Sequence, residues 1–243
     1  MFATFIQKGE LIVYPFFEYY RDHDYEYKPA ELGFGLEQDF QGKFRATERL
    51  IFLAYGLTDR LAVEFEAANI SARLDKAPDD PSTMPSFIEE SGIGDVEGQV
   101  RMRWADETAS RPEIFSYFEA VSPQNRAKKI IGTDDWEFKF GTGAIRSTSI
   151  GTFAIRAAAE YERVERKIDL GEYAVEYMRR LSSRLRIYTG IEGSQDEVEW
   201  INELQVRLSS YATLKLNSAF GATPKATDWG PEVGILFSFP ARR

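Results

Sequence analysis

The sequence predicts an all-β protein, folded as a 12-stranded antiparallel up-and-down transmembrane β-barrel. Apolar and polar residues alternate with period two, the alternating segments are even in number, and short connections alternate with longer ones. The segment Leu50–Phe65 shows this design, because a turn at 56–59 joins two extended runs. Beyond the turn, the two faces are Leu61, Val63 and Phe65, and Ala62, Glu64 and Glu66.

Twelve such segments are predicted along the chain. They are Glu10–Tyr20, Phe44–Tyr55, Arg60–Ala68, Asp95–Trp104, Glu113–Val121, Asp135–Arg146, Phe153–Arg163, Leu170–Arg180, Arg184–Glu192, Glu197–Arg207, Ala212–Phe220 and Val233–Phe239. The connections near residues 57, 108, 150, 182 and 209 are short, and those near 30, 80, 128, 167, 195 and 226 are longer or more polar. This pattern is typical of outer-membrane barrels, and it places both termini on the short-turn, periplasmic side.

Local sequence supports individual elements. Asp95–Trp104 has the cleanest alternation of apolar and charged residues. Pro15 is unusual within a central strand, because proline has no N–H to donate to a neighbour. We expect 21–43 to be polar, with part of it extending strands beyond a membrane, and 69–92 to be a long loop. No linker divides residues 1–243, so we predict a single domain with a short N-terminal segment at 1–8 and a C-terminal tail at 240–243.

Composition excludes several classes of protein. A net charge of -9 argues against a nucleic-acid partner. The absence of cysteine excludes disulfides and thiolate metal sites, and a single histidine, His23, excludes a histidine-rich site. Asp22 and Asp24, or Asp79 and Asp80, could offer oxygen ligands to a hard cation such as Ca²⁺, but no EF-hand spacing is present, so we predict no metal and no cofactor. The uncharged run at Leu50–Thr58 is far shorter than the roughly 18 residues of a transmembrane helix, whereas a membrane-spanning strand needs only about 9–11.

The first residues show no signal peptide, because Met1–Thr4 leads directly into Gln7–Glu10 without a basic or an apolar segment. The simplest interpretation is a mature-length chain with an added initiator methionine, and the alternative is a protein that is never exported. On the first interpretation, we expect a monomer in the bacterial outer membrane. Its partners would be outer-membrane lipid, a small solute and, during biogenesis, the barrel-assembly machinery.

Two stretches resemble a known family. YGLTDRLAVEF at Tyr55–Phe65 and GIGDVEGQVRMRW at Gly92–Trp104 are similar to bacterial outer-membrane proteins of the phenol-degradation meta-pathway, transporter-like family. Ser122-Pro123, after the fifth segment, is similar too. The resemblance covers most of the chain from about Gly9 and rests on turn motifs. It implies an outer-membrane barrel that passes small or hydrophobic compounds, and it brings no catalytic residues.

Strand direction gives each charged residue a height in the barrel and predicts two layers in the lumen. The basic layer, towards the periplasmic end, contains Arg101, Arg103, Arg156, Arg180, Arg184, Arg186, Arg207 and Lys215. The acidic layer, towards the outer end, contains Asp95, Glu97, Glu137, Glu160, Glu162, Glu172, Glu192, Glu199 and Glu232, and Glu176 and Glu203 lie between the two layers. Lys139 and Glu64 are exceptions to this order. Because charges removed from water need counter-charges, we expect a belt of ion pairs where the layers meet.

Several interpretations of the barrel stay open. In the first, the lumen is a passive channel or uptake pore for a small solute, including a hydrophobic or aromatic one. In the second, Arg and Glu fill a closed lumen, and the barrel is structural or binds a partner. A lipase-type enzyme would need a serine beside His23, and none is close in sequence, so we predict no catalytic residues and no enzyme. A soluble lipocalin-like barrel or sandwich would require the opposite assignment of faces.

Overall fold

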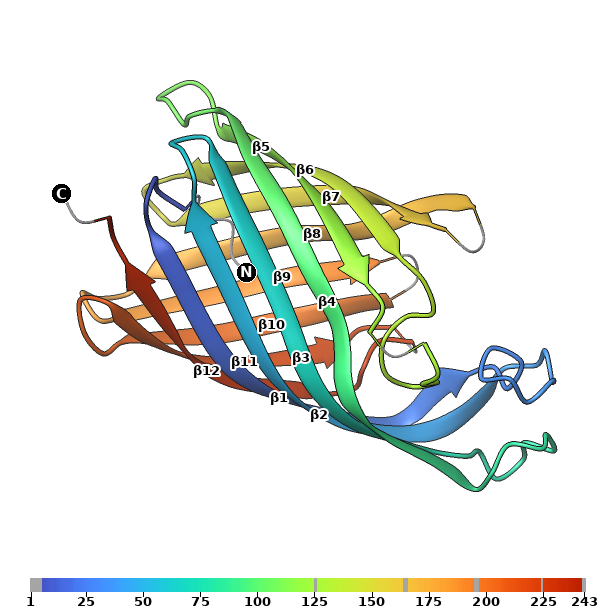
Figure 1. Ribbon diagram of the computed structural model, residues 1–243. Helices are drawn as coiled ribbons and strands as arrows, with labels where there is room; N and C mark the ends of the chain where they lie inside the picture. Colours follow the sequence, from blue (N-terminus) through green and yellow to red (C-terminus); the bar gives the residue numbers. More distant parts are fainter. Residues whose placement is uncertain (1–5, 125, 164–165, 195–196, 224, 242–243) are drawn as a thin grey trace.

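In a computed structural model, the chain forms a closed barrel of twelve antiparallel strands (Figure 1). The structure describes residues 6–241 except 125, 164–165, 195–196 and 224. The strands are β1 (Leu11–Tyr27), β2 (Phe40–Gly56), β3 (Leu61–Asp75), β4 (Phe87–Ala105), β5 (Glu113–Ser122), β6 (Glu137–Ser147), β7 (Thr152–Glu162), β8 (Lys167–Arg180), β9 (Leu185–Ser194), β10 (Glu197–Arg207), β11 (Ala212–Gly221) and β12 (Gly230–Phe239). Each strand pairs with its neighbours in sequence, and β1 closes the barrel against β12. This confirms the predicted fold class. None of the described residues forms a helix long and apolar enough to cross a membrane.

The two ends of the barrel differ in their connections. One end, here called the turn end, carries the connections 57–60, 106–112, 148–151, 181–184 and 208–211, together with the start of β1 and the end of β12. The opposite end, the loop end, carries 28–39, 76–86, 123–136 and 222–229. Two further loop-end connections are short, because only 163–166 and 195–196 separate their strands. The predicted alternation in length is therefore clearest in the first half of the chain.

The first four strands are longer than predicted, and the expectation of a loop at 69–92 was wrong for most of that segment. β3 continues to Asp75 and β4 begins at Phe87, so 76–86 alone connects them. The hairpins β1–β2 and β3–β4 project beyond the rest of the barrel (Figure 1). They hold together because an apolar cluster forms between them, which includes Tyr27, Phe40, Leu74, Met84 and Ile88. Its members come from both hairpins, so local alternation could not reveal it.

The outer surface of the barrel is apolar. Phe140, Val175 and Leu216 expose 61%, 59% and 42% of their surface on this face. Trp104 and Tyr211, near strand ends, are exposed as well. Monomeric soluble proteins rarely expose a continuous apolar surface of this kind, so the band indicates contact with lipid. The faces therefore follow the transmembrane assignment and not the soluble alternative.

The inner face combines charged side chains with aromatic rings that lie over glycines. Phe115 pairs with Gly143, and Tyr117 with Gly141, across the β5–β6 ladder. A Cβ atom added at either glycine would overlap the ring of its partner. These large rings take up lumen volume on the β5–β6 wall, and the lining of the central cavity comes from other strands.

Candidate functional site: the charged lumen

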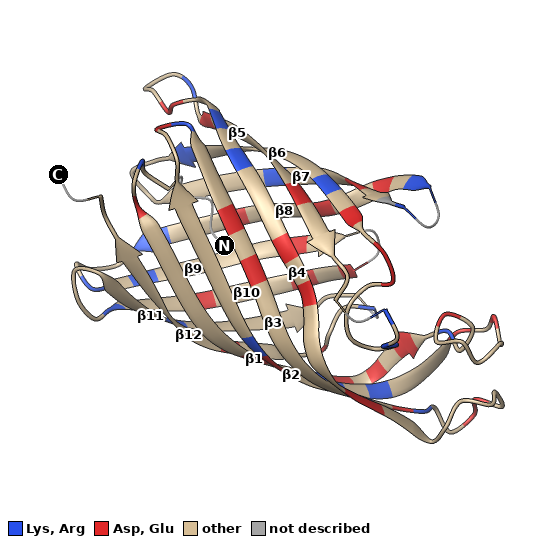
Figure 2. Ribbon diagram, in the orientation of Figure 1, with Lys and Arg blue, Asp and Glu red and all other residues tan. Residues whose placement is uncertain are grey.

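The lumen contains a central cavity of about 470 Å³. Its lining comes from inward-facing positions of β1–β4 and β8–β12. The acidic lining residues are Glu18, Glu48, Glu66, Glu97, Glu172, Glu192, Glu199, Glu203 and Glu232. A single cation, Lys215, is part of the same lining. The cavity is therefore strongly acidic, and in Figure 2 positions of Asp and Glu are seen along the middle of several strands.

Two cations lie against other glutamates of this acidic lining. Arg156 on β7 donates to Glu172 Oε2 at 3.0 Å and to Glu192 Oε2 at 2.8 Å. Lys139 on β6 places its Nζ atom 3.3 Å from Glu172 Oε1 and 3.5 Å from Glu119 Oε1. Glu160, from the predicted acidic layer, lies 4.0 Å from the same Nζ. At this height the acids and bases of neighbouring strands are interleaved.

A second cavity, of about 360 Å³, lies at the turn end of the lumen. Arg184, Arg186, Arg207 and Lys215 line it. Lys215 also lines the central cavity, where its Nζ lies 2.7 Å from Glu203 Oε2, so the two spaces adjoin. Arg180 lies opposite Arg186 in the β8–β9 register. Four arginines of the predicted basic layer thus gather near one opening of the barrel.

The remaining predicted bases lie on β4. Arg103 is at the turn end and forms ion pairs with Asp106 at 3.0 Å and with Glu113 at 3.4 Å. Arg101 lines a third cavity, of about 260 Å³, which also borders Glu66 and Glu97 of the central cavity. Its guanidinium carbon lies 4.1 Å from the centre of the Phe115 ring. Its nearest carboxylate oxygen, Glu64 Oε1, is 4.0 Å from Nη1, so this ion pair is loose.

The remaining predicted acids have different surroundings. Glu176 is 1% exposed and accepts a hydrogen bond from the Tyr188 hydroxyl at 3.3 Å. Asp95 accepts the backbone N–H of Thr133 at 2.7 Å and thereby holds the β5–β6 loop. The side chain of Glu162 lies outside the described residues.

The β5–β6 loop, residues 123–136, folds towards the loop-end opening. Ile131 is 3% exposed and packs against Ala46 and Ala72 on the inner side of β2 and β3. The backbone N–H groups of Lys129 and Ile130 donate to Glu90 Oε2 at 2.8 and 3.0 Å. Sequence reasoning described this segment as an ordinary loop, although two adjacent isoleucines in a polar stretch were a signal that it is anchored.

Three acids of the central cavity were absent from the predicted acidic layer: Glu18, Glu48 and Glu66. Glu18 shares a strand face with Tyr14, and Glu66 shares one with Glu64, so the same period-two signal was present. The two predicted layers nevertheless include none of these three residues. The ion pairs of the described lumen residues include none of Glu18, Glu48, Glu66 or Glu97. These four form an acidic wall on consecutive strands, β1 to β4.

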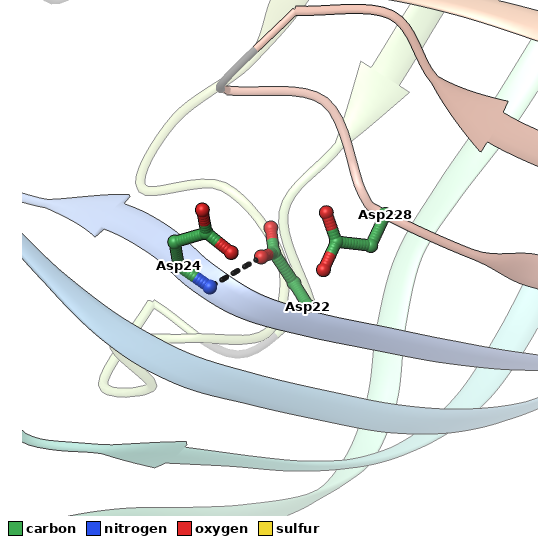
Figure 3. A group of neighbouring side chains, drawn as sticks. All are labelled: Asp22, Asp24 and Asp228. Carbon is green, nitrogen blue, oxygen red and sulfur yellow. Dashed lines mark hydrogen bonds between the residues drawn. The ribbon is translucent and has the colours of Figure 1, made fainter.

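At the loop end, β1 lies beside the β11–β12 connection. His23 Nδ1 is 3.0 Å from Asp228 Oδ2, and the His23 backbone N–H donates to the same oxygen at 3.0 Å. Asp22 and Asp24 lie next to Asp228 in this corner (Figure 3). The contacts described for His23 are thus with a carboxylate, and none of them is with a serine hydroxyl.

This architecture, a closed barrel with an apolar exterior and a charged interior, is that of outer-membrane β-barrels. A crystal structure of an outer membrane channel from Pseudomonas putida F1 is similar, with a TM-score of 0.66 and 13% sequence identity over 98% of this chain and 97% of that one. The translocator domain of the autotransporter NalP from Neisseria meningitidis gives a TM-score of 0.55 and 10% identity over 96% of this chain and 89% of that one. No protein-family model matches the sequence, and no curated protein matches it significantly. At these identities the likeness concerns the fold.

Proposed function

We propose that this protein is an outer-membrane channel through which small polar solutes diffuse passively, with cations preferred over anions. The observation that carries the proposal is the central cavity, where nine glutamates face one lysine. A volume of about 470 Å³ is within the range of cavities that hold small molecules. Rings of acidic side chains favour cations in a pore, because they replace part of the hydration that a cation loses on entry.

The basic cavity at the turn end gives the path a second zone. On the predicted orientation, the turn end faces the periplasm, so a solute would pass the acidic section before the arginines. The polar lining supports passage of polar or charged solutes more than of the hydrophobic compounds implied by the family resemblance. Compounds that combine a cationic group with an aromatic ring are compatible with both the acidic lining and the family resemblance, because Tyr14 and Tyr188 also line the central cavity.

A closed barrel with a structural or binding role is the second candidate, and two observations favour it. Ile6 is 5% exposed and packs with Ile12, Tyr14, Phe52 and other inner-face residues, which narrows the turn end. The β5–β6 loop narrows the loop end through Ile131. These contacts would keep the lumen closed unless the segments move.

Single-channel recording separates the two candidates. The protein, purified in detergent and checked for folding by heat-dependent gel mobility, is inserted into a planar bilayer under a tenfold KCl gradient. A perfectly cation-selective pore would reverse at about 59 mV, and an unselective one near zero. We expect cation preference in the native protein and a shift towards zero when Glu48, Glu66 and Glu97 are all changed to glutamine.

Glu31→Gln is the matched control, because Glu31 is exposed in the 28–39 loop and pairs with Lys28 at 3.1 Å. It should leave the reversal potential unchanged. A folded protein that gives no conductance would refute the channel proposal and favour the closed barrel. Anion preference, or an unchanged reversal potential in the triple variant, would refute the role of the acidic wall.

A further inference from the structure

The contact between β1 and β12, which closes the barrel, is weakest at the loop end. The two strands pair from Leu11↔Phe239 to Glu18↔Glu232, and Pro15 lies in an interruption of this ladder. Beyond Glu18, an isolated bridge at Arg21↔Trp229 joins them, with backbone hydrogen bonds of 3.0 and 3.2 Å. The membrane-spanning part of β1 takes up about ten residues, so this corner projects beyond the membrane.

Three carboxylates converge at this corner. One oxygen from each of Asp22, Asp24 and Asp228 lies within 4.8 Å of the others. Figure 3 shows the Asp22 carboxylate between those of Asp24 and Asp228. Oxygens that share one Ca²⁺ at about 2.4 Å lie no more than about 4.8 Å apart, and these three groups meet that condition.

The Asp22 side chain has a buried oxygen without a partner. Asp22 is 3% exposed, its Oδ1 atom accepts the Asp24 backbone N–H at 2.9 Å, and its Oδ2 atom is buried with no hydrogen-bond partner. The ion pairs of the described residues include neither Asp22 nor Asp24 with a lysine or an arginine. A buried carboxylate oxygen without a donor or a cation is unfavourable, and native structures rarely contain one.

The electrostatics of the corner agree with this geometry. Burial raises the pKa of Asp22; the Asp24 N–H opposes that shift, and the charges of Asp228 and Asp24 add to it. Hydrogen bonds from the side chain and backbone of His23 hold the pKa of Asp228 below its ordinary value. Both bonds go to Asp228 Oδ2 and hold this carboxylate at the corner.

We propose that Asp22, Asp24 and Asp228 form a Ca²⁺ site that fastens β1 to the β11–β12 loop where the barrel closes. Three carboxylates and no described nitrogen or sulfur ligand suit a hard cation. Asp24 and Asp228 are exposed, so water can complete the six to eight ligands of Ca²⁺ in irregular geometry, which Mg²⁺ tolerates poorly. Sequence reasoning predicted no metal because Asp22 and Asp24 show no EF-hand spacing, and the third carboxylate, Asp228, is 205 positions from His23.

Terbium luminescence tests the site in the intact, chelator-treated protein. Tb³⁺ takes the place of Ca²⁺ and emits when a nearby indole absorbs light, and Trp229 directly follows Asp228. We expect saturable emission at micromolar Tb³⁺ that is removed by excess Ca²⁺. Asp22→Asn and Asp24→Asn should each weaken binding at least about tenfold, the smaller effect seen when a supporting residue of a metal site is lost. Because Asp24 is exposed, its variant should fold even if that of Asp22 does not.

The matched control is Asp79→Asn, which removes an exposed carboxylate from the 76–86 loop of the same end. It should leave Tb³⁺ binding unchanged. Ca²⁺ should also raise the midpoint of the heat-dependent gel shift in the native protein and in the control, but not in Asp24→Asn, because an ion that binds only the folded state stabilises it. The proposal is overturned by emission that does not saturate, by full binding in Asp24→Asn, or by equal loss in Asp79→Asn.

Discussion

Replacing Arg156 with glutamine tests whether the ion pairs of the lumen hold the barrel together. Arg156 is on β7, and its side chain is 18% exposed. It pairs with Glu172 on β8 at 3.0 Å and with Glu192 on β9 at 2.8 Å, so one guanidinium links side chains of three strands. Glutamine has a similar stem but no charge, and it would leave two carboxylates facing each other.

The expected cost follows from the surroundings of the pair. Two unit charges 4 Å apart interact by about 4 kcal/mol at an effective dielectric constant near 20. Breaking a buried pair by removing one partner costs about 3–5 kcal/mol, and exposed pairs cost much less. Glu172 is 39% exposed and keeps Lys139 at 3.3 Å, so its loss is partly compensated. We therefore expect Arg156→Gln to lower the free energy of unfolding by about 3 kcal/mol, the low end of the buried range.

The assay is urea unfolding in detergent micelles, followed by tryptophan fluorescence and gel mobility. Arg126→Gln is the control, because Arg126 is 60% exposed in the β5–β6 loop and pairs with Asp135 at 3.0 Å. Its cost should stay below about 1 kcal/mol. In a double-mutant cycle, Arg156→Gln and Glu192→Gln should be non-additive, because the two side chains touch. A loss below about 1 kcal/mol in Arg156→Gln, or additive losses in the cycle, would show that the belt is not stabilising.

Two further substitutions test the inner and outer faces. Gly141→Val should lower the free energy of unfolding by about 1–3 kcal/mol through overpacking, because its Cβ would overlap the Tyr117 ring. Gly98→Val is its control and should be tolerated, because a Cβ there meets no atom within 4 Å. Equal unfolding midpoints in the two variants would contradict the ring packing. Leu216→Arg, on the outer face of β11, should cost about 2–4 kcal/mol when folding is measured in lipid vesicles. Leu208→Arg is its control, because Leu208 lies in the turn 208–211 and should tolerate the charge; the same small change in both variants would argue against a lipid-facing strand.

Much of the fold could be read from local sequence. In a strand, neighbouring side chains point to opposite sides, so residues such as Glu97 and Val100 were assigned to inner and outer faces before any tertiary contact was known. Interrupting turns, such as Ser182-Ser183, divided the chain into twelve segments. The predicted segments for β1 to β4 were too short. The extension of those hairpins depends on an apolar cluster that contains Tyr27 and Leu74, which are on different hairpins.

The candidate site could be predicted only in part. Alternation identified which charged residues face the lumen and predicted ion pairs where the two layers meet, but it could not show that Arg156 pairs with Glu172 and Glu192. The reason is that the height of a residue depends on the register between strands, and each register is fixed by turns and bulges around the whole barrel. Bulges between Ala67 and Asn69 and between Ala157 and Ala159 shift these heights.

The sequence by itself determined the twelve alternating strands and their inner and outer faces, because these are properties of consecutive residues. Tertiary structure alone decided which charges meet, how far the lumen is filled and where distant segments touch. Asp22 and Asp228 show this most directly: they become neighbours only when the first and last strands pair. Closure of the sheet brings the ends of the chain together, and no local pattern encodes the contacts made there.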